Sequence, residues 1–378
     1  MNGRELLLRT LRGERTCRIP VAPFIHHNFI DEFFGRQGCD GVEKGIEVYE
    51  HFGFDIILRT CSVGGYLDET LCGGTKWRVS QHTEELREGD TWRVVTTVQT
   101  PEKTLRQVKQ FARVYEYETV EAIIEYYIKD EDDFHQFIKY QPGLPELDCG
   151  QIAKARRLLG EKGLAAPWAQ GAFNMASMFR KLDDLLTDAY LQPELYDAMM
   201  RYFSGRALEA VKQFVGAGAD IISVAGNAAS GGTVGPDYFR NHVLPYERAF
   251  ADGVKALGAY YLYHNCGDSR KLIPLYPGIG MDVYESLTPP PYGDADLDEA
   301  FEAFGESVTL SGNFDQIHAL RYWSGPEIEE GVRAVMAKAK KRGRFIFATT
   351  DYFNEKTPHD NIRTLAEAAR KYGNYGAG

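Results

Sequence analysis

Short apolar runs alternate along the chain with longer stretches in which apolar and polar residues follow the helical period. Runs rich in Val, Ile and Phe are typical of buried parallel strands, and apolar positions three and four residues apart are typical of amphipathic helices. Helices are predicted over residues 44–53, 193–218 and 236–258. Strands are predicted over residues 18–26, 54–60, 163–173, 219–226, 259–266, 280–287, 307–314 and 343–351.

Residues 62–100 depart from this order. Polar and apolar residues alternate there on both sides of an "EGD" turn, which is typical of a β-hairpin. We interpret the segment as an insertion that covers one end of the domain. The helical pattern returns at residue 102, with Thr100 as a possible cap and Pro101 in the first helical position.

Counting conservatively, the pattern contains about eight strand–helix units without a low-complexity linker, which fits a closed parallel barrel. A doubly wound sheet would require a glycine-rich phosphate loop after its first strand, and "APFIHHNFIDEFFG" supplies none. The sequence therefore predicts a single α/β domain over residues 1–378. Its fold is a (β/α)8 TIM barrel with an N-terminal hairpin insertion.

Polar side chains follow the predicted strands at their carboxyl ends. In a barrel these ends converge on one cavity, where active sites are built. The residues at these positions are His26, His27, Asn28, Arg59, Thr60, Gln170, Phe173, Asn174, Asn227, His264, Cys266, Asp268, Glu285, Asn313, Asp315 and Asp351.

His264 and Cys266 carry the most specific chemical signal in this set. Residues two apart on a strand point to the same face, so the imidazole and the thiol can reach one ion. Both groups are typical zinc ligands, and a catalytic zinc takes three protein ligands. The alternative is a chance pair, because cysteine is often simply buried.

Composition narrows the classes of function. The 378 residues carry a formal net charge of −11, so the chain has no basic footprint for nucleic acid. No segment is long and apolar enough to span a membrane, and the opening residues do not form a signal peptide, so a cytoplasmic protein is expected. The six cysteines show no CxxC spacing and are expected to be mostly reduced.

The run "GADIISVAGNAASGGTVGPDYFRNHVLPYERAFADGVKALGAYYLYHNCGD", with "LSGNFD" and "TPHDNIRTLAEAARKYG" further on, resembles the uroporphyrinogen decarboxylase superfamily. This resemblance implies the same (β/α)8 barrel and one of two chemistries. One is cofactor-free decarboxylation of uroporphyrinogen. The other is zinc-dependent methyl transfer to or from a corrinoid protein, whose members carry a His-x-Cys pair and a distant third ligand.

The resemblance favours methyl transfer. The decarboxylases place an arginine-rich motif after the first strand, where this chain reads "IHHNFIDEFFG". The coenzyme M-linked methyltransferases place a cysteine just before a "TP..N" turn, but here "TPHDN" is preceded by Asp351 in "ATTDYF". Asp351 is therefore the predicted third ligand and Glu285 the reserve. A capping role for Asp351 and a salt bridge for Glu285 remain alternatives.

A carboxylate in place of a thiolate makes the zinc a harder centre that suits oxygen donors. The prediction is methyl transfer from a methoxylated, aromatic substrate to the cob(I)alamin of a partner corrinoid protein, that is, O-demethylation. His27 or Glu285 is the predicted proton donor. The predicted substrate contacts are His26, Asn28, Gln170, Phe173, Asn174 and Asn227.

Other functions stay open at this point. One is transfer of a methyl group from a methylcorrinoid protein to a thiol or a pterin. A second is metal-free decarboxylation, and a third is a binding protein that keeps the barrel without catalysis. Neither the direction of transfer nor the formation of a homo-oligomer is decided by the sequence.

Overall fold

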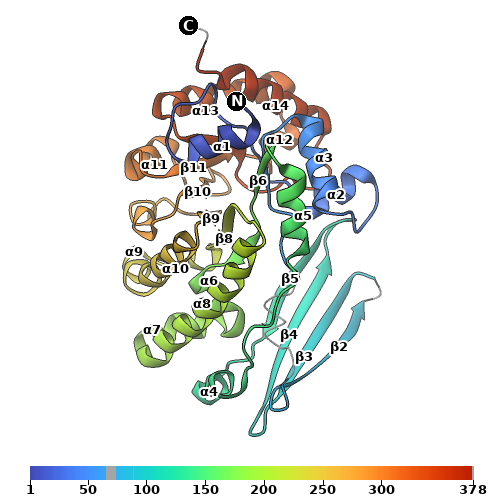
Figure 1. Cartoon of the computed structure of the whole chain (residues 1–378), viewed down its shortest axis with the longest axis vertical. Coiled ribbons are helices and arrows are strands. Elements are labelled where there is room, and N and C mark those ends of the chain that lie inside the picture. The colour runs from blue at the N-terminus through green and yellow to red at the C-terminus, as the bar shows by residue number, and fades with distance from the viewer. Residues whose placement is uncertain (65–73, 88, 377–378) are drawn as a thin grey trace.

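The computed structural model describes residues 1–64, 74–87 and 89–376. Parallel strands form the centre of the molecule and helices surround them (Figure 1). Six strands pair in the order β12-β11-β10-β9-β8-β7, and β1 pairs with β6. These strands are β1 (Ile56–Leu58), β6 (Gly163–Ala165), β7 (Trp168–Gln170), β8 (Ile221–Ala225), β9 (Tyr260–Asn265), β10 (Val283–Ser286), β11 (Thr309–Phe314) and β12 (Phe345–Thr349).

Backbone hydrogen bonds link these two sheets into the ring. Val21 forms a parallel bridge with Phe347 of β12, and its carbonyl accepts from Asp55 N at 2.8 Å, just before β1. On the other side of β1, the Leu58 carbonyl accepts from Ala166 N at 2.9 Å. The eight-stranded barrel predicted from the sequence is thus confirmed.

Prolines account for two differences from the predicted strands. The strand expected over 18–26 is reduced to isolated bridges at Arg18 and Val21, because Pro20 and Pro23 have no N–H to donate to a ladder. The strand expected over 163–173 is interrupted at Pro167 and gives β6 and β7. Residues 172–179 beyond it are helical.

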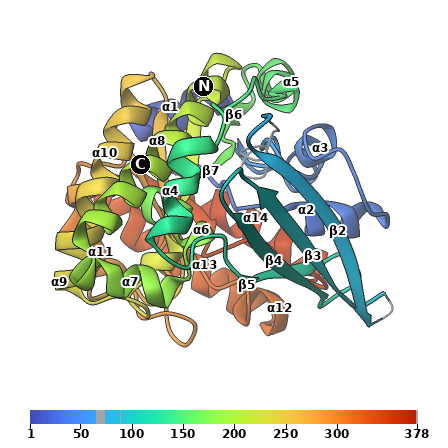
Figure 2. The same cartoon turned by 90° about the horizontal axis from the view of Figure 1, so that it is seen from below.

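The helices cover the outside of the barrel (Figures 1 and 2). The long helix predicted over 236–258 is present, with a π-helical turn at Phe239–Val243 ahead of Pro245, which cannot donate an α-helical hydrogen bond. The helices are α1 (Gly3–Leu11), α2 (His27–Phe34), α3 (Glu43–Phe52), α4 (Glu131–Tyr140), α5 (Gly150–Leu159), α6 (Ala172–Phe179), α7 (Leu182–Leu191), α8 (Pro193–Gly216), α9 (Pro236–Tyr238), α10 (Leu244–Ala256), α11 (Leu297–Phe304), α12 (Ala319–Tyr322), α13 (Gly325–Arg342) and α14 (His359–Gly373).

A small apolar cluster fills the interior near the amino ends of the strands. Leu7 and Leu11 of α1 pack against it and close that end of the barrel. The strand residues in this cluster are Ala22, Ile57, Leu164, Ala166, Ile221, Leu262, Val283 and Ile346. Because side chains on a strand alternate between faces, the residue two positions further along each strand also points inward, toward the carboxyl end.

The insertion is larger than the predicted hairpin. It forms a four-stranded antiparallel sheet of β2 (Arg78–Arg87), β3 (Thr91–Gln99), β4 (Thr104–Arg113) and β5 (Thr119–Glu125), which extends from one side of the barrel (Figure 2). The predicted hairpin corresponds to β2 and β3, although residues 65–73 and 88 lie outside the described residues.

The helix predicted from residue 102 is wrong, because that segment forms β4. Its backbone pairs with β3 on one side and β5 on the other, and this pairing outweighs the local helical pattern. Thr100 closes the β3–β4 turn instead of capping a helix, since its hydroxyl accepts from Lys103 N at 3.0 Å.

Candidate metal centre

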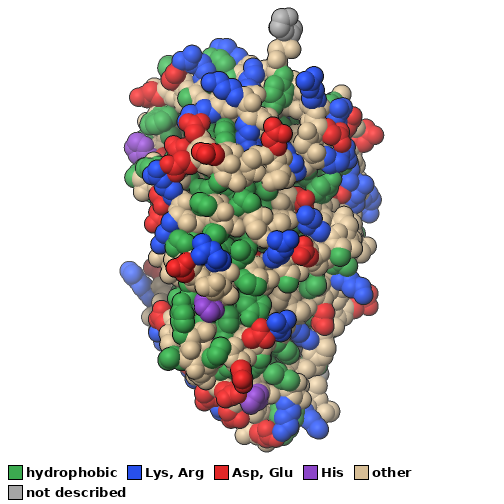
Figure 3. Space-filling view, turned by 90° about the vertical axis from the view of Figure 1, so that its left-hand side faces the viewer, with side chains coloured by type: hydrophobic (Ala, Val, Ile, Leu, Met, Phe, Trp, Pro, Cys, Tyr) green, Lys and Arg blue, Asp and Glu red, His purple; other side chains and the backbone are tan. Residues whose placement is uncertain are grey.

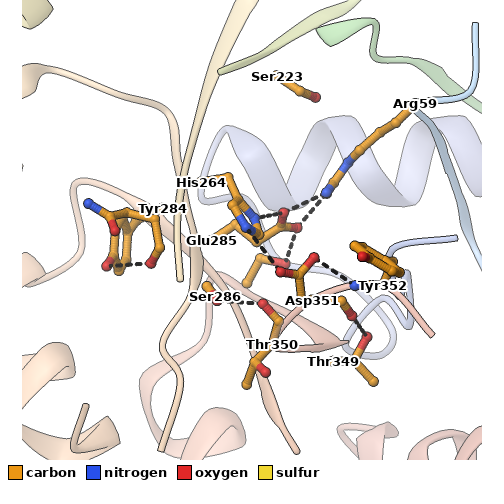
Figure 4. Close-up of polar contacts among 12 residues, drawn as sticks. Arg59, Ser223, His264, Tyr284, Glu285, Ser286, Thr349, Thr350, Asp351 and Tyr352 are labelled. Atoms are coloured by element: carbon orange, nitrogen blue, oxygen red, sulfur yellow. Dashed lines mark hydrogen bonds and ion pairs between the residues drawn. The ribbon is translucent and has the colours of Figure 1, made fainter. Parts of the chain in front are cut away.

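Alternation along the strands places polar side chains one step above the apolar cluster. Arg59 follows Ile57, His264 follows Leu262 and Glu285 follows Val283, each two residues further along its strand. Figure 4 shows these side chains converging at the carboxyl end of the barrel. All three are almost fully buried, so each charge must be balanced inside the protein.

Three potential metal ligands meet beside this layer. Ligand atoms of His264, Cys266 and Asp351 all lie within 4.8 Å of one another. His264 Nε2 is 3.8 Å from Asp351 Oδ2, and the Asp351 side chain keeps 28% of its exposure. One nitrogen, one sulfur and one oxygen donor form a set that suits zinc. In the described part of the chain, this is the one such group of three residues.

Glu285 orients the imidazole from the other side. Its Oε2 lies 2.9 Å from His264 Nδ1, which leaves Nε2 directed toward Asp351. A ligating histidine commonly gives its second ring nitrogen to a carboxylate in this way, and this fixes the tautomer and the ring orientation. Phe24 and Trp168 pack edge-on against the same ring, with centroids 6.4 and 5.7 Å away.

Arg59 neutralises Glu285. Its guanidinium donates from Nη1 to Oε2 at 2.5 Å and from Nη2 to Oε1, and Ser311 Oγ adds a bond of 3.3 Å to Oε1. Arg59 also lies over the rings of Phe24, at 4.6 Å, and Trp168, at 5.5 Å. Both terminal nitrogens of the guanidinium are thus paired with Glu285, while Nε is buried without a hydrogen-bond partner.

The pKa values follow from these contacts. Burial alone would raise the pKa of Glu285, but the charge of Arg59 and the hydrogen bond with His264 lower it to about 2. Burial would lower the pKa of His264, but hydrogen bonds with Cys266 and Glu285 raise it to about 10, and a metal ion bound at Nε2 would displace that proton. Glu285 is therefore ionised, which does not suit the proton-donor role that the sequence suggested for it.

Asp351 is held by its own loop. Its Oδ1 accepts from Tyr352 N at 2.8 Å, and its backbone carbonyl accepts from Thr349 Oγ1 at 2.7 Å. Tyr352 lies against Phe24 and His26, with centroid distances of 5.7 and 5.1 Å. The local hydrogen bond resembles the capping alternative, but the second oxygen remains directed toward His264.

The inserted sheet reaches this loop through the turn between β4 and β5. Tyr352 Oη donates to Glu118 Oε1 at 2.7 Å, and the Tyr117 N–H donates to Glu355 Oε2 at 2.9 Å. Glu116 N adds a bond of 3.2 Å to Glu355 Oε1. The insertion therefore supports the segment that carries Asp351.

The predicted substrate contacts, and the predicted proton donor His27, differ in how exposed their side chains are. His26 is half-buried beside Tyr352, and its Nδ1 lies 3.1 Å from Oδ1 of the buried Asn28. His27 is exposed on the first turn of α2, and Gln170 is half-buried at the end of β7.

The other three predicted contacts lie on or beside α6. Phe173 is 1% exposed and packs in the core against Tyr238. Asn174 Oδ1 accepts from Ala228 N at 3.1 Å, and Asn227 is exposed in the short 3₁₀ turn Asn227–Ala229.

Several residues of the site were not assigned a role from the sequence. Phe24, Trp168 and Ser311 line the buried layer, and Tyr352 adjoins Asp351. Their spacing is a usable signal. Phe24 and Trp168 lie two residues beyond Ala22 and Ala166 of the apolar cluster, and Ser311 lies two residues beyond Thr309, which pairs with Val283 of that cluster. Tyr352 carried no such signal, because it lies in a loop.

Residues 113–372 match the sequence profile of the family described as Uroporphyrinogen decarboxylase (URO-D). The chain belongs to this family. The methylcobamide:CoM methyltransferase MtbA of Methanosarcina mazei is 23% identical over 259 residues, which cover 66% of this chain and 71% of the relative. A uroporphyrinogen decarboxylase of Carboxydothermus hydrogenoformans is 25% identical over 183 residues, which cover 47% of this chain and 48% of the relative.

Among solved structures, a methyltransferase from Methanosarcina mazei superimposes with a TM-score of 0.71. The alignment covers 98% of this chain and 99% of that one at 15% sequence identity, and this shows the shared fold. No helix within the described residues is both long and apolar enough to span a membrane.

Proposed function

We propose that this member of the URO-D family is a zinc-dependent methyltransferase that exchanges a methyl group with a corrinoid protein. The observation that carries the proposal is the His264–Cys266–Asp351 cluster with Glu285 on the far side of the imidazole. The similarity to a methylcobamide:CoM methyltransferase supports the same class of reaction.

The donor set fits zinc, with His264, Cys266 and Asp351 as its ligands. When bound there, zinc supplies a Lewis acid that stabilises negative charge on the atom from which the methyl group departs or to which it is transferred. Glu285 keeps His264 Nε2 directed at the site, and Arg59 keeps Glu285 ionised. Phe24 and Trp168 exclude water from the inner wall, which strengthens each electrostatic contact.

We propose an oxygen-bound methyl group, as in an aryl methyl ether, as the donor. Asp351 supports this choice, because a carboxylate ligand makes the centre harder than a second thiolate does. His26, Asn28 and Tyr352 would orient the substrate beside Asp351. His27, which is exposed on the first turn of α2, would serve as the proton donor to the departing oxygen.

A second candidate is methyl transfer between a corrinoid and a thiol. Similarity to a relative named as a methylated-thiol–coenzyme M methyltransferase favours it; that protein is 25% identical over 154 residues, which cover 41% of this chain and 38% of the relative. Decarboxylation is less well supported. Arg59, the buried cation nearest the cluster, is already paired with Glu285 and is not free to bind a substrate carboxylate.

The deciding experiment uses the full chain loaded with zinc. Cob(I)alamin is mixed with methoxylated aromatic compounds, and formation of methylcobalamin is followed in the visible spectrum. Methylcobalamin is mixed with thiols in a parallel reaction. Methylation of cobalt by an ether supports the first candidate, and demethylation by a thiol supports the second. Absence of both reactions, together with failure to bind zinc, would overturn the proposal.

A further inference from the structure

A cavity of about 840 Å³ lies at the opposite end of the barrel from the metal centre. It is lined by the loop after α1, by the end of α13 and by the beginning of β12. Phe345 begins β12 at the cavity, whereas Asp351 follows β12 at the metal centre. Its volume falls within the range of about 300–1,000 Å³ that is usual for small-molecule sites.

The lining of this cavity is strongly basic. Six basic and two acidic residues contribute to it, in a chain whose formal net charge is −11. The basic residues are Arg12, Arg15, Lys340, Lys341, Arg342 and Arg344, and the acidic residues are Glu14 and Glu306. Glu14 is already paired with Arg12, at 2.6 Å, and with Arg9, at 3.2 Å.

Two of these cations are held by neutral acceptors. Arg342 donates to the carbonyl oxygens of Gly305, Val308, Gly343 and Arg344, at 2.6 to 3.2 Å. Arg344 donates to the Glu306 and Leu11 carbonyls and to Thr309 Oγ1, at 2.7 to 3.2 Å. These bonds fix both guanidinium groups without cancelling their charge.

The pKa values agree with this excess of positive charge. Burial and the neighbouring Arg344 lower the pKa of Arg342 to about 10, and burial lowers that of Arg344. Arg342 Nε is buried without a hydrogen-bond partner. Neither guanidinium, nor Arg15, Lys340 or Lys341, forms an ion pair with a carboxylate of the described residues. Over the side of the molecule that Figure 3 presents, by contrast, Lys and Arg side chains are interspersed with Asp and Glu.

We propose that this cavity is a binding site for a small polyanion that carries two or more phosphate groups. Arg342 and Arg344 provide a fixed cationic base, while Arg15, Lys340 and Lys341 have unpaired charges with which to neutralise the ligand. Tyr375, which is 39% exposed, lines the same cavity and offers a ring face to a base or sugar attached to the phosphates. The site is independent of methyl transfer, because none of its residues contributes to the metal centre.

Titration calorimetry of the full chain with inorganic triphosphate tests the proposal. We expect saturable binding of one triphosphate per chain, weaker binding of orthophosphate and a steep loss of affinity with added salt. The double variant Lys340→Gln/Lys341→Gln should weaken triphosphate binding at least about tenfold, since it removes two cations from the lining. Lys340→Arg/Lys341→Arg keeps both charges and should bind within about threefold of the parent.

Arg333→Gln/Lys338→Gln is the matched control. It removes the same two charges from the same helix, α13, but both residues pair with acids outside the cavity, Glu330 and Asp298. Its affinity for triphosphate should stay within about twofold. ATP binding more tightly than triphosphate would identify a nucleotide as the ligand, and equal binding would identify the phosphates alone. Absence of saturable triphosphate binding, or equal weakening in the two Gln variants, would overturn the proposal.

Discussion

At the carboxyl end of the barrel, Arg59 is buried against Glu285, whereas at the amino end Arg342 and Arg344 are held by uncharged carbonyl and hydroxyl oxygens. In the first case the protein neutralises its own cation, and the pair then serves to fix His264. In the second case the positive charge remains available to a ligand. The same residue type thus supports a pre-organised reaction site at one end and a charged binding surface at the other.

The largest effect should come from breaking the carboxyl end at Cys266. Cys266→Ala removes the one thiolate of the proposed ligand set and leaves an imidazole and a carboxylate, so we expect the variant to lose zinc and methyl transfer together. Metal content after gel filtration measures the first, and cobalamin spectroscopy the second. Cys17→Ala and Cys149→Ala are matched controls at an exposed and a half-buried position, and both should keep the metal. Retention of zinc by all three variants would remove Cys266 from the site.

The next largest effect should be on stability and come from the buried ion pair between Arg59 and Glu285. Arg59→Met should lower the free energy of unfolding by about 3–5 kcal/mol, because it leaves Glu285 buried without its cation. Adding Glu285→Gln should recover part of this loss, which a denaturant series can measure as a coupling energy. If the losses of the two single variants simply add in the double variant, Arg59 and Glu285 are not coupled, and Glu285 is supported mainly by His264 and Ser311 instead.

Asp351 tests the chemistry of the same end. Asp351→Ala should reduce methyl transfer from an aryl methyl ether by about 10²-fold, or about 2.7 kcal/mol, because the departing oxygen loses its electrostatic stabilisation. Asp351→Cys should keep zinc, lose activity on ethers and gain activity toward a thiol. Initial rates with both kinds of substrate measure this. Parent-like activity in Asp351→Ala would show that the carboxylate has only the local role of accepting a hydrogen bond from Tyr352 N.

Glu247 sharpens the comparison, because this carboxyl group is fully buried and pairs with no cation among the described residues. Burial raises its pKa to about 7, although the backbone N–H of Phe173 and of Ala172 donate to it. The native state therefore binds more protons than the unfolded state between about pH 4.5 and 7, and stability should fall by at most about 3 kcal/mol across that range. Glu247→Gln should flatten this part of the pH profile of unfolding. If the pH dependence of the free energy of unfolding is unchanged in Glu247→Gln, other titratable groups are responsible for it.

The sequence predicted the barrel and the polar residues at the carboxyl ends of its strands because both rest on local patterns. Strand–helix alternation identified the fold, and strand-end positions identified His264, Cys266 and Asp351, which the structure brings together. It did not predict β4, since the pairing of residues 104–113 depends on β3 and β5. Nor did it predict that Arg59 neutralises Glu285, because the two residues are 226 positions apart and only closure of the barrel joins them.

The smallest effect concerns the contact between the insertion and the carboxyl end. Tyr352→Phe removes the bond to Glu118 Oε1 but keeps the ring against Phe24 and His26. The loop that carries Asp351 should loosen by about 1 kcal/mol, the value of one such hydrogen bond. We therefore expect the methyl donor to bind about fivefold more weakly. Zinc should remain bound, because no ligand atom is removed.

Tyr322→Phe provides the control for this change, since Tyr322 is 67% exposed and lies outside the site. Glu118→Gln weakens the same contact from the insertion and should reproduce the Tyr352→Phe effect. If KM for the donor rises in Tyr352→Phe and Glu118→Gln but not in Tyr322→Phe, the inserted sheet belongs functionally to the carboxyl end. If KM is parent-like in all three variants, the inserted sheet only covers the barrel and does not affect binding of the donor. The site then depends on the barrel strands alone.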